Sequence, residues 1–127
     1  MRKIKFRGKS GNEWLYGSLY QIDYYGTNEK NCYILEDFSG CEFKYSEVSQ
    51  ESVGEYTGLK DKNGKDIYEG DIVKRPDSET KFIIVFNKGS FCIQDSENLH
   101  YNLGLLDSIS SFLNVIGNTY ENKELLK

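Results

Sequence analysis

The sequence predicts an all-β fold, with short helical turns near the C-terminus. Ten Tyr and seven Phe stand against a single Pro, and aromatic residues favour the pleated, half-buried surface of a strand. Short apolar or alternating segments are separated by turns rich in Gly, Asn and Asp, a pattern typical of small barrels and sandwiches. The 127 residues contain no repeat or linker. We therefore expect one domain over residues 1–127.

The N-terminal half contains four segments expected as strands: 4–6, 14–22, 32–35 and 42–48. The last two are expected to form a hairpin around Ser39-Gly40. In the second arm Cys41, Phe43 and Tyr45 alternate with polar residues, which predicts a half-buried strand with these three on its apolar face. Gly17 is interpreted as a β-bulge.

In the middle of the chain, residues 53–59 are followed by two turns in quick succession. At the first turn, a two-residue Asn-Gly loop would place Asp61 opposite Asp66, a like-charge pair that costs energy. A type I turn with Gly64 in the left-handed region would instead place Asp61 opposite Lys65, with the Asp61 carboxylate bonding the backbone. We prefer the second arrangement.

The C-terminal half begins with a strand opened by Gly70-Asp71, in which the Asp carboxylate is expected to bond turn amides. The apolar run 82–86 is expected to be covered on both faces and to form the centre of the core, in a hairpin with 91–93. Residues 103–113 suggest a helical turn that includes Phe112, and 114–118 a final strand. Asn122 is expected to cap a last turn through Leu126.

The composition excludes several functional classes. The net charge is −4, so the footprint of a strongly basic nucleic-acid-binding domain is missing. Cys32, Cys41 and Cys92 are odd in number and form no Cys-x-x-Cys pair, and His100 has no cysteine near it, so no metal or cofactor is expected. Neither a signal peptide nor a membrane-spanning segment is evident. We expect a cytoplasmic protein with free thiols.

One block of sequence is distinctive enough to suggest a family. It runs from Val53 to Val73 as VGEYTGLKDKNGKDIYEGDIV, with further matches at 4–7, 16–17, 115–118 and 120–126. The chain resembles the YopX family of phage and prophage proteins over its whole length, although Gly8-Lys9, Thr119 and Lys123 depart from the family pattern. The resemblance implies an accessory protein of a mobile element whose biochemical role is unknown, and it supplies no catalytic residues.

No residue pattern predicts catalysis. The spacing of Gly58, Gly64 and Gly70 among lysines suggests a phosphate loop, but Asp66 stands where the Ser or Thr of a Gly-Lys-Ser/Thr motif belongs, and turns explain each glycine. Asp66, Glu69 and Asp71 are interpreted as solvent-facing turn residues rather than an acid–base group. His100 lies in a polar stretch and is expected to be exposed. We therefore do not expect an enzyme.

The sequence favours a protein-interaction module. The aromatic stretch 14–25 suggests a binding surface, and the candidate partner-binding residues are Tyr20, Tyr24, Tyr25, Lys60, Lys62 and Lys65. The expected partner is a host or phage protein. Nucleic acid is the alternative, because Gly70-Asp71-Ile72-Val73 resembles the opening of a strand in SH3-like barrels; this suggests a small, partly open barrel with an N-terminal β extension. No membrane partner is expected, and exposed strand edges permit self-association.

Overall fold

The computed structural model describes residues 3–23, 26, 30–36, 44–95, 100–101 and 110–126, and its regular structure is almost entirely β-strand. Within these ranges the helical segments are short 3₁₀ turns, and the strands pair antiparallel. The predicted all-β class is therefore confirmed, while the SH3-like barrel stays a prediction. Contacts divide the chain into two compact units, residues 1–56 and 57–127, which are described separately. The single domain expected from chain length also stays a prediction.

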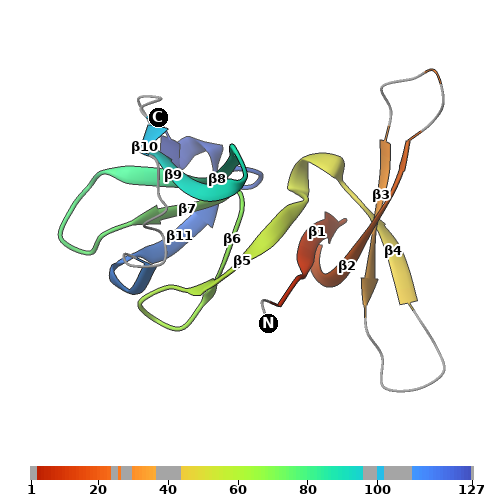
Figure 1. Ribbon diagram of the computed structural model, residues 1–127, viewed down its shortest axis with the longest axis horizontal. Coiled ribbons are helices and arrows are strands. Elements are labelled where there is room, and N and C mark those ends of the chain that lie inside the picture. The colour runs from red at the N-terminus through yellow and green to blue at the C-terminus, as the bar shows by residue number, and fades with distance from the viewer. Residues whose placement is uncertain are drawn as a thin grey trace. The chain divides into compact units, whose positions relative to one another are not determined.

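The first unit is built around the long strand β2. Its N-terminal half pairs with β1 and its C-terminal half with β3, which in turn pairs with β4, while β1 also pairs with the start of β5 (Figure 1). The elements are β1 (Phe6–Ser10), β2 (Glu13–Asp23), β3 (Lys30–Glu36), β4 (Lys44–Val48), the 3₁₀ turn η1 (Gln50–Ser52) and the first part of β5 (Gly54–Lys60).

Gly17 lies where β2 changes partners from β1 to β3. The register is continuous at this point, with Phe6 opposite Gly17 and Leu35 opposite Ser18, so the predicted bulge is wrong. A Cβ atom on Gly17 would lie only 2.1 Å from the carbonyl oxygen of Leu35. The glycine is therefore explained by a close approach of the backbone of β3.

The core of the first unit lies on one face of the sheet. Its buried members are Leu15, Cys32, Ile34 and Val48, with Phe6, Leu19 and Val53 packed around them. Val48 pairs with Cys32, and since side chains alternate along a strand, Tyr45 points to the other face, where it is exposed. The prediction that Tyr45 shares a covered face is wrong; Cys41 and Phe43 lie outside the described residues.

The second unit contains a five-stranded sheet in the order β10-β9-β8-β7-β11, and the rest of β5 lies beside β6. β11 carries a register shift between Val115 and Gly117. The elements are β6 (Asp66–Tyr68), β7 (Asp71–Lys74), β8 (Lys81–Asn87), β9 (Ser90–Asp95), β10 (His100–Tyr101), the turn η2 (Ser110–Phe112), β11 (Asn114–Asn118) and the turn η3 (Lys123–Leu126).

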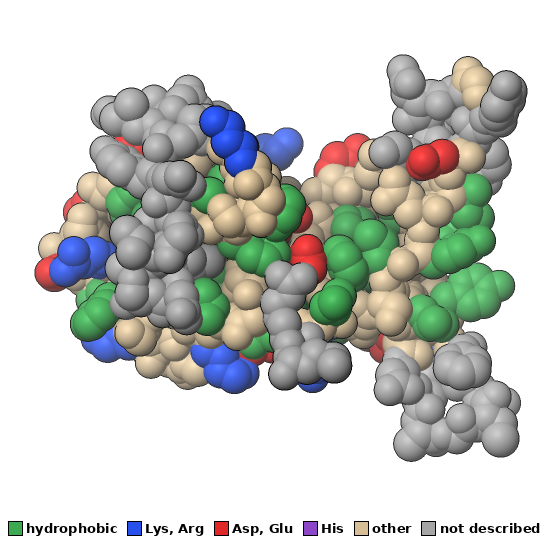
Figure 2. Space-filling model, in the orientation of Figure 1, with side chains coloured by type: hydrophobic (Ala, Val, Ile, Leu, Met, Phe, Trp, Pro, Cys, Tyr) green, Lys and Arg blue, Asp and Glu red, His purple; other side chains and the backbone are tan. Residues whose placement is uncertain are grey.

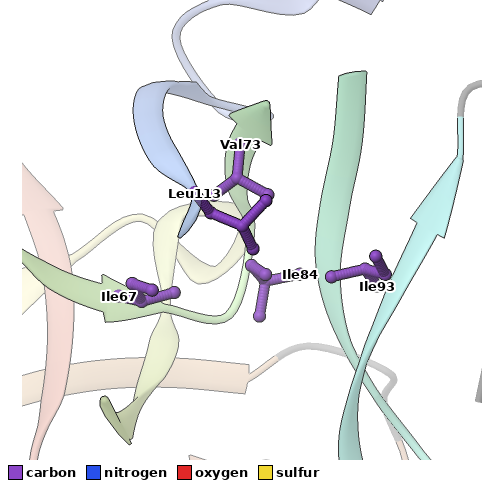
Figure 3. Close-up of a cluster of buried hydrophobic side chains, with 5 residues drawn as sticks. All are labelled: Ile67, Val73, Ile84, Ile93 and Leu113. Carbon is purple, nitrogen blue, oxygen red and sulfur yellow. The ribbon is translucent and has the colours of Figure 1, made fainter. Parts of the chain in front are cut away.

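The core of the second unit joins one buried side chain from each of several elements. Figure 3 shows Ile67, Val73, Ile84, Ile93 and Leu113 gathered together. The run 82–86 forms the predicted strand and hairpin but is not covered on both faces. Ile84 is fully buried, whereas Ile83 and Val85, which alternate to the other face of the strand, are only half-buried and do not belong to the core cluster. Phe86 shares the face of Ile84 but is 49% exposed near the end of β8, where it packs edge-on against Phe91 with ring centroids 5.0 Å apart.

The C-terminal segment confirms the strand at 114–118. Residues 102–109, most of the predicted helical turn, lie outside the described residues, while 110–112 form the 3₁₀ turn η2, in which Phe112 is 60% exposed. The Asn122 side-chain oxygen accepts a hydrogen bond from the Asn118 N–H at 3.1 Å. Asn122 therefore closes the turn that follows β11, and this bond runs backwards along the chain rather than into η3.

Candidate functional site

Three tyrosines form a row on the side of the first unit that faces away from its core. Tyr20 on β2 pairs directly with Tyr33 on β3, and Tyr45 on β4 lies diagonally across from Tyr33. The ring centroids of Tyr20 and Tyr33 are 6.3 Å apart, and those of Tyr33 and Tyr45 are 6.0 Å apart. We call Tyr20, Tyr33 and Tyr45 the outer tyrosine face.

The outer tyrosine face is open to solvent. Tyr20 is 61% exposed and Tyr45 68% exposed, with the half-buried Tyr33 between them. Figure 2 shows hydrophobic side chains, a class that includes tyrosine, at the surface over β2, β3 and β4. The three rings stand on three adjacent hydrogen-bonded strands. They form an aromatic surface that lies outside the core of this unit.

Three cations lie beside aromatic rings around β1. Lys5 Nζ is 4.7 Å from the centre of the Tyr56 ring, the Arg7 guanidinium carbon is 4.8 Å from that of Trp14, and Lys9 Nζ is 5.5 Å from that of Trp14. We call these five residues the cation–aromatic cluster. Trp14 and Tyr20 stand an even number of residues apart on the continuous strand β2 and therefore share a face. Cations over aromatic faces are held electrostatically.

The turn after β5 adopts the arrangement that the sequence favours, with Asp61 opposite Lys65. The Asp61 N–H donates to the Lys65 carbonyl at 2.8 Å, and Gly64 has a φ of +82°. One oxygen of the buried Asp61 carboxylate accepts from the N–H groups of Asn63 and Lys65, at 2.8 and 2.9 Å. The prediction of a type I turn with Asp61 opposite Lys65 is confirmed. The turn is built by the carboxylate and needs no bound phosphate.

The acidic residues near the second turn have different environments. Asp71 is 1% exposed, and its Oδ2 accepts from the Tyr68 N–H at 2.7 Å. The expected bond to a turn amide is confirmed, but the prediction that Asp71 faces solvent is wrong, because this bond requires the carboxylate to turn inward. Asp66 Oδ1 instead lies 2.6 Å from Lys60 Nζ in an ion pair whose lysine is exposed and whose carboxylate is half-buried.

The candidate residues fall in two units. Tyr20 lies in the first, on the outer tyrosine face, and Tyr24 and Tyr25 lie outside the described residues. Lys60, Lys62 and Lys65 belong to the second unit and have exposed side chains around the Asp61 turn. Their roles in partner binding stay predictions.

Sequence reasoning missed Tyr33 and Tyr45 as members of the site. Tyr33 lies in the apolar run Cys32 to Leu35, which gives no alternation to show its direction. Tyr45 alternates with polar residues, but the pairing of β4 with β3 turns it outward. The excess of tyrosine in the sequence was the available signal, since the core of so small a chain can bury only a limited number of aromatic rings.

Among the described side chains, no group of three or more His, Cys, Asp or Glu is placed to hold a metal ion. The same part of the chain contains no helix long and apolar enough to cross a membrane. The backbone of His100 forms part of β10, and its side chain lies outside what the structure describes.

Comparison with known proteins places the chain in a family. The crystal structure of protein EF1440 from Enterococcus faecalis is similar over 100% of both chains, with a TM-score of 0.59 and 24% sequence identity, which is a likeness of fold. No curated protein matches the chain significantly. The model of the family described as YopX protein matches residues 5–127, so this protein belongs to the YopX family.

Proposed function

We propose that the protein is a non-enzymatic interaction module of a phage or prophage that binds a host or phage protein through the outer tyrosine face. The observation that carries this proposal is the exposure of Tyr20 and Tyr45 on either side of Tyr33. Tyrosine offers a large contact area, a polar hydroxyl and little conformational entropy to lose on binding. It is accordingly enriched among residues that dominate binding energy.

Two further features support this function. The apolar core of the first unit lies on the opposite face of the sheet, so the three aromatic rings of the outer face are not needed to fill it. The phage or prophage origin follows from what the family resemblance implies. A location in the bacterial cytoplasm fits the buried free thiols of Cys32 and Cys92, because a reducing compartment keeps thiols unoxidised.

Affinity capture from bacterial lysate, with and without nuclease, tests the proposal. The chain is compared with the double variant Tyr20→Ser/Tyr45→Ser and with Tyr120→Ser, which removes a partly exposed tyrosine of the second unit. We expect a defined protein that survives nuclease, is lost with the double variant and is kept by the control. A protein that both variants retain equally would contradict a role for this face.

A second candidate function is the binding of single-stranded nucleic acid. The cation–aromatic cluster favours it, because Lys5 and Lys9 are partly exposed and Lys9 lies next to the partly exposed ring of Trp14, although Arg7 and Tyr56 are buried. Single-strand binders combine such charge with rings on which bases stack. Lys62 and Lys65 of the second unit add exposed charge.

Fluorescence anisotropy with labelled oligonucleotides separates the two functions. Nucleic-acid binding predicts an affinity that falls steeply between about 50 and 200 mM salt, and that falls further in Lys5→Gln/Lys9→Gln. The absence of binding to any DNA or RNA strand at low salt would remove this candidate and leave the protein-binding function as it stands.

A further inference from the structure

The second unit has an apolar hollow that its core does not fill. It has a volume of about 420 Å³ and is lined by Arg75, Phe82, Ile93, Phe112 and Leu113. Ile93 and Leu113 are buried core residues, and Phe82 packs against the same core. Phe112, by contrast, is 60% exposed. Four of the five lining side chains are hydrophobic, so the hollow suits an apolar group.

A second hollow of about 430 Å³ shares Arg75 and Phe112 with the first and has a more polar lining. Its other lining residues are Lys62, Pro76, Asp77 and Ser111. Lys62 and Arg75 are cationic and Asp77 is the one acid among the lining residues named here. Both volumes lie within the range of roughly 300–1,000 Å³ typical of small-molecule sites. The apolar hollow therefore adjoins a second hollow whose named lining residues carry a net positive charge.

Backbone hydrogen bonds position the two residues that carry the cations, Lys62 and Arg75. The Lys62 N–H donates to the Leu113 carbonyl at 2.8 Å, which fixes the Asp61 turn next to η2. Lys74 pairs with Asn114, so Arg75 follows directly at the same end of this strand pair. The positive charges are thus positioned by two separate elements that converge on the residues next to Phe112.

The Arg75 guanidinium is available to a ligand. Its Nε is 3.4 Å from Asp77 Oδ1, and both side chains are more than half exposed. An exposed ion pair of this kind contributes little free energy. A ligand carboxylate that can bind the planar guanidinium with two parallel hydrogen bonds can therefore compete with Asp77.

We propose that the two hollows together bind a small organic anion with an apolar body, of the class of medium-chain or aryl carboxylates. The apolar body lies against Phe82, Ile93 and Phe112, and the carboxylate faces Arg75 and Lys62. This site belongs to the second unit and does not depend on the outer tyrosine face.

A titration with decanoate, followed by ¹H–¹⁵N NMR, tests the site. We expect saturable shifts that centre on the amides of Lys62, Arg75 and Leu113, with decylammonium binding about tenfold more weakly because the rim is positive. Phe112→Ala is expected to weaken decanoate binding about tenfold through the loss of apolar contact. Since Phe112 is largely exposed, denaturation should show this variant to be folded.

Charge reversal at Arg75 and Lys62 provides a more stringent test of the proposed site. In Arg75→Glu/Lys62→Glu the preference should invert, so that decylammonium binds better than decanoate, whereas Lys123→Glu, an exposed change in η3, should leave the preference unaltered. The proposal is overturned by shifts that do not saturate, by equal binding of both probes to the unmodified protein, or by an unchanged preference in the charge-reversed variant. Binding of decanoate to Phe112→Ala with full affinity would also contradict it.

Discussion

The Asp61 carboxylate accepts a hydrogen bond from the backbone N–H of Val115, 54 residues further along the chain, at 3.0 Å. Its other oxygen accepts from Asn63 and Lys65 within its own turn. One buried side chain therefore both closes the turn after β5 and fastens it to the start of β11. This link also places Lys62 beside the hollows of the second unit.

Removing the Asp61 carboxylate should destabilise the second unit. In Asp61→Ala three backbone N–H groups lose their acceptor, and we expect a loss of about 2–4 kcal/mol in the free energy of unfolding. Urea denaturation measures the change. Asp77→Ala, at an exposed carboxylate, is the matched control and should cost less than about 1 kcal/mol. Equal stabilities for the two variants would show that the Asp61 bonds contribute nothing.

A methyl group at position 17 should disrupt the pairing of β2 with β3. In Gly17→Ala the new Cβ would lie 2.1 Å from the Leu35 carbonyl oxygen, so the backbones must separate, at a cost of about 3 kcal/mol or more. In Gly11→Ala the Cβ enters open space and only the positive φ of +62° is strained, which costs about 1–2 kcal/mol. Thermal unfolding of both variants tests this order, and a smaller effect at position 17 would contradict the close approach.

The two buried thiols provide a local probe for each unit. Cys32 belongs to the core of the first unit, and Cys92 is buried on β9 of the second. Both should resist alkylation in the native protein and react on unfolding, as quantified by site-resolved mass spectrometry. Gly17→Ala should accelerate labelling of Cys32, and Asp61→Ala labelling of Cys92. Native labelling of either thiol at the rate seen in denaturant would disprove its burial.

The β-rich class and the turns could be predicted from the sequence because both depend on residues that are close together in the chain. Gly64 and Gly70 adopt the positive φ values that their turns require, and the choice between two forms of the Asp61 turn followed from the charges opposite one another. Strand 114–118 was likewise predicted with its observed bounds.

What the sequence could not provide was the direction in which strands face. Tyr45 belongs to a locally alternating segment, but its direction is decided by the pairing of Val48 with Cys32 on another strand. Phe86 ends an apolar run that local patterning assigns to the core, and it shares a face with the buried Ile84, yet it is exposed. The outer tyrosine face depends on three strands in register, and the hollows depend on contacts between residues about fifty positions apart.

Loss of the exposed tyrosines should leave the fold almost unchanged. In Tyr20→Ser/Tyr45→Ser the first unit loses two ring pairs, worth about 0.5–1.5 kcal/mol each, and no core contact. Circular dichroism and urea denaturation should therefore show a folded protein with a modest loss of stability. A loss above about 5 kcal/mol would mean that the outer tyrosine face serves folding rather than binding.

The most direct test of the proposed function is a photo-crosslinking residue at position 45, introduced in place of Tyr45 and irradiated in bacterial lysate after nuclease treatment. The same residue at position 120 is the control. We expect a discrete crosslinked protein from position 45 and none from position 120. An identical set of crosslinked proteins from the two positions, or a captured partner that never crosslinks at position 45, would contradict binding through the outer tyrosine face.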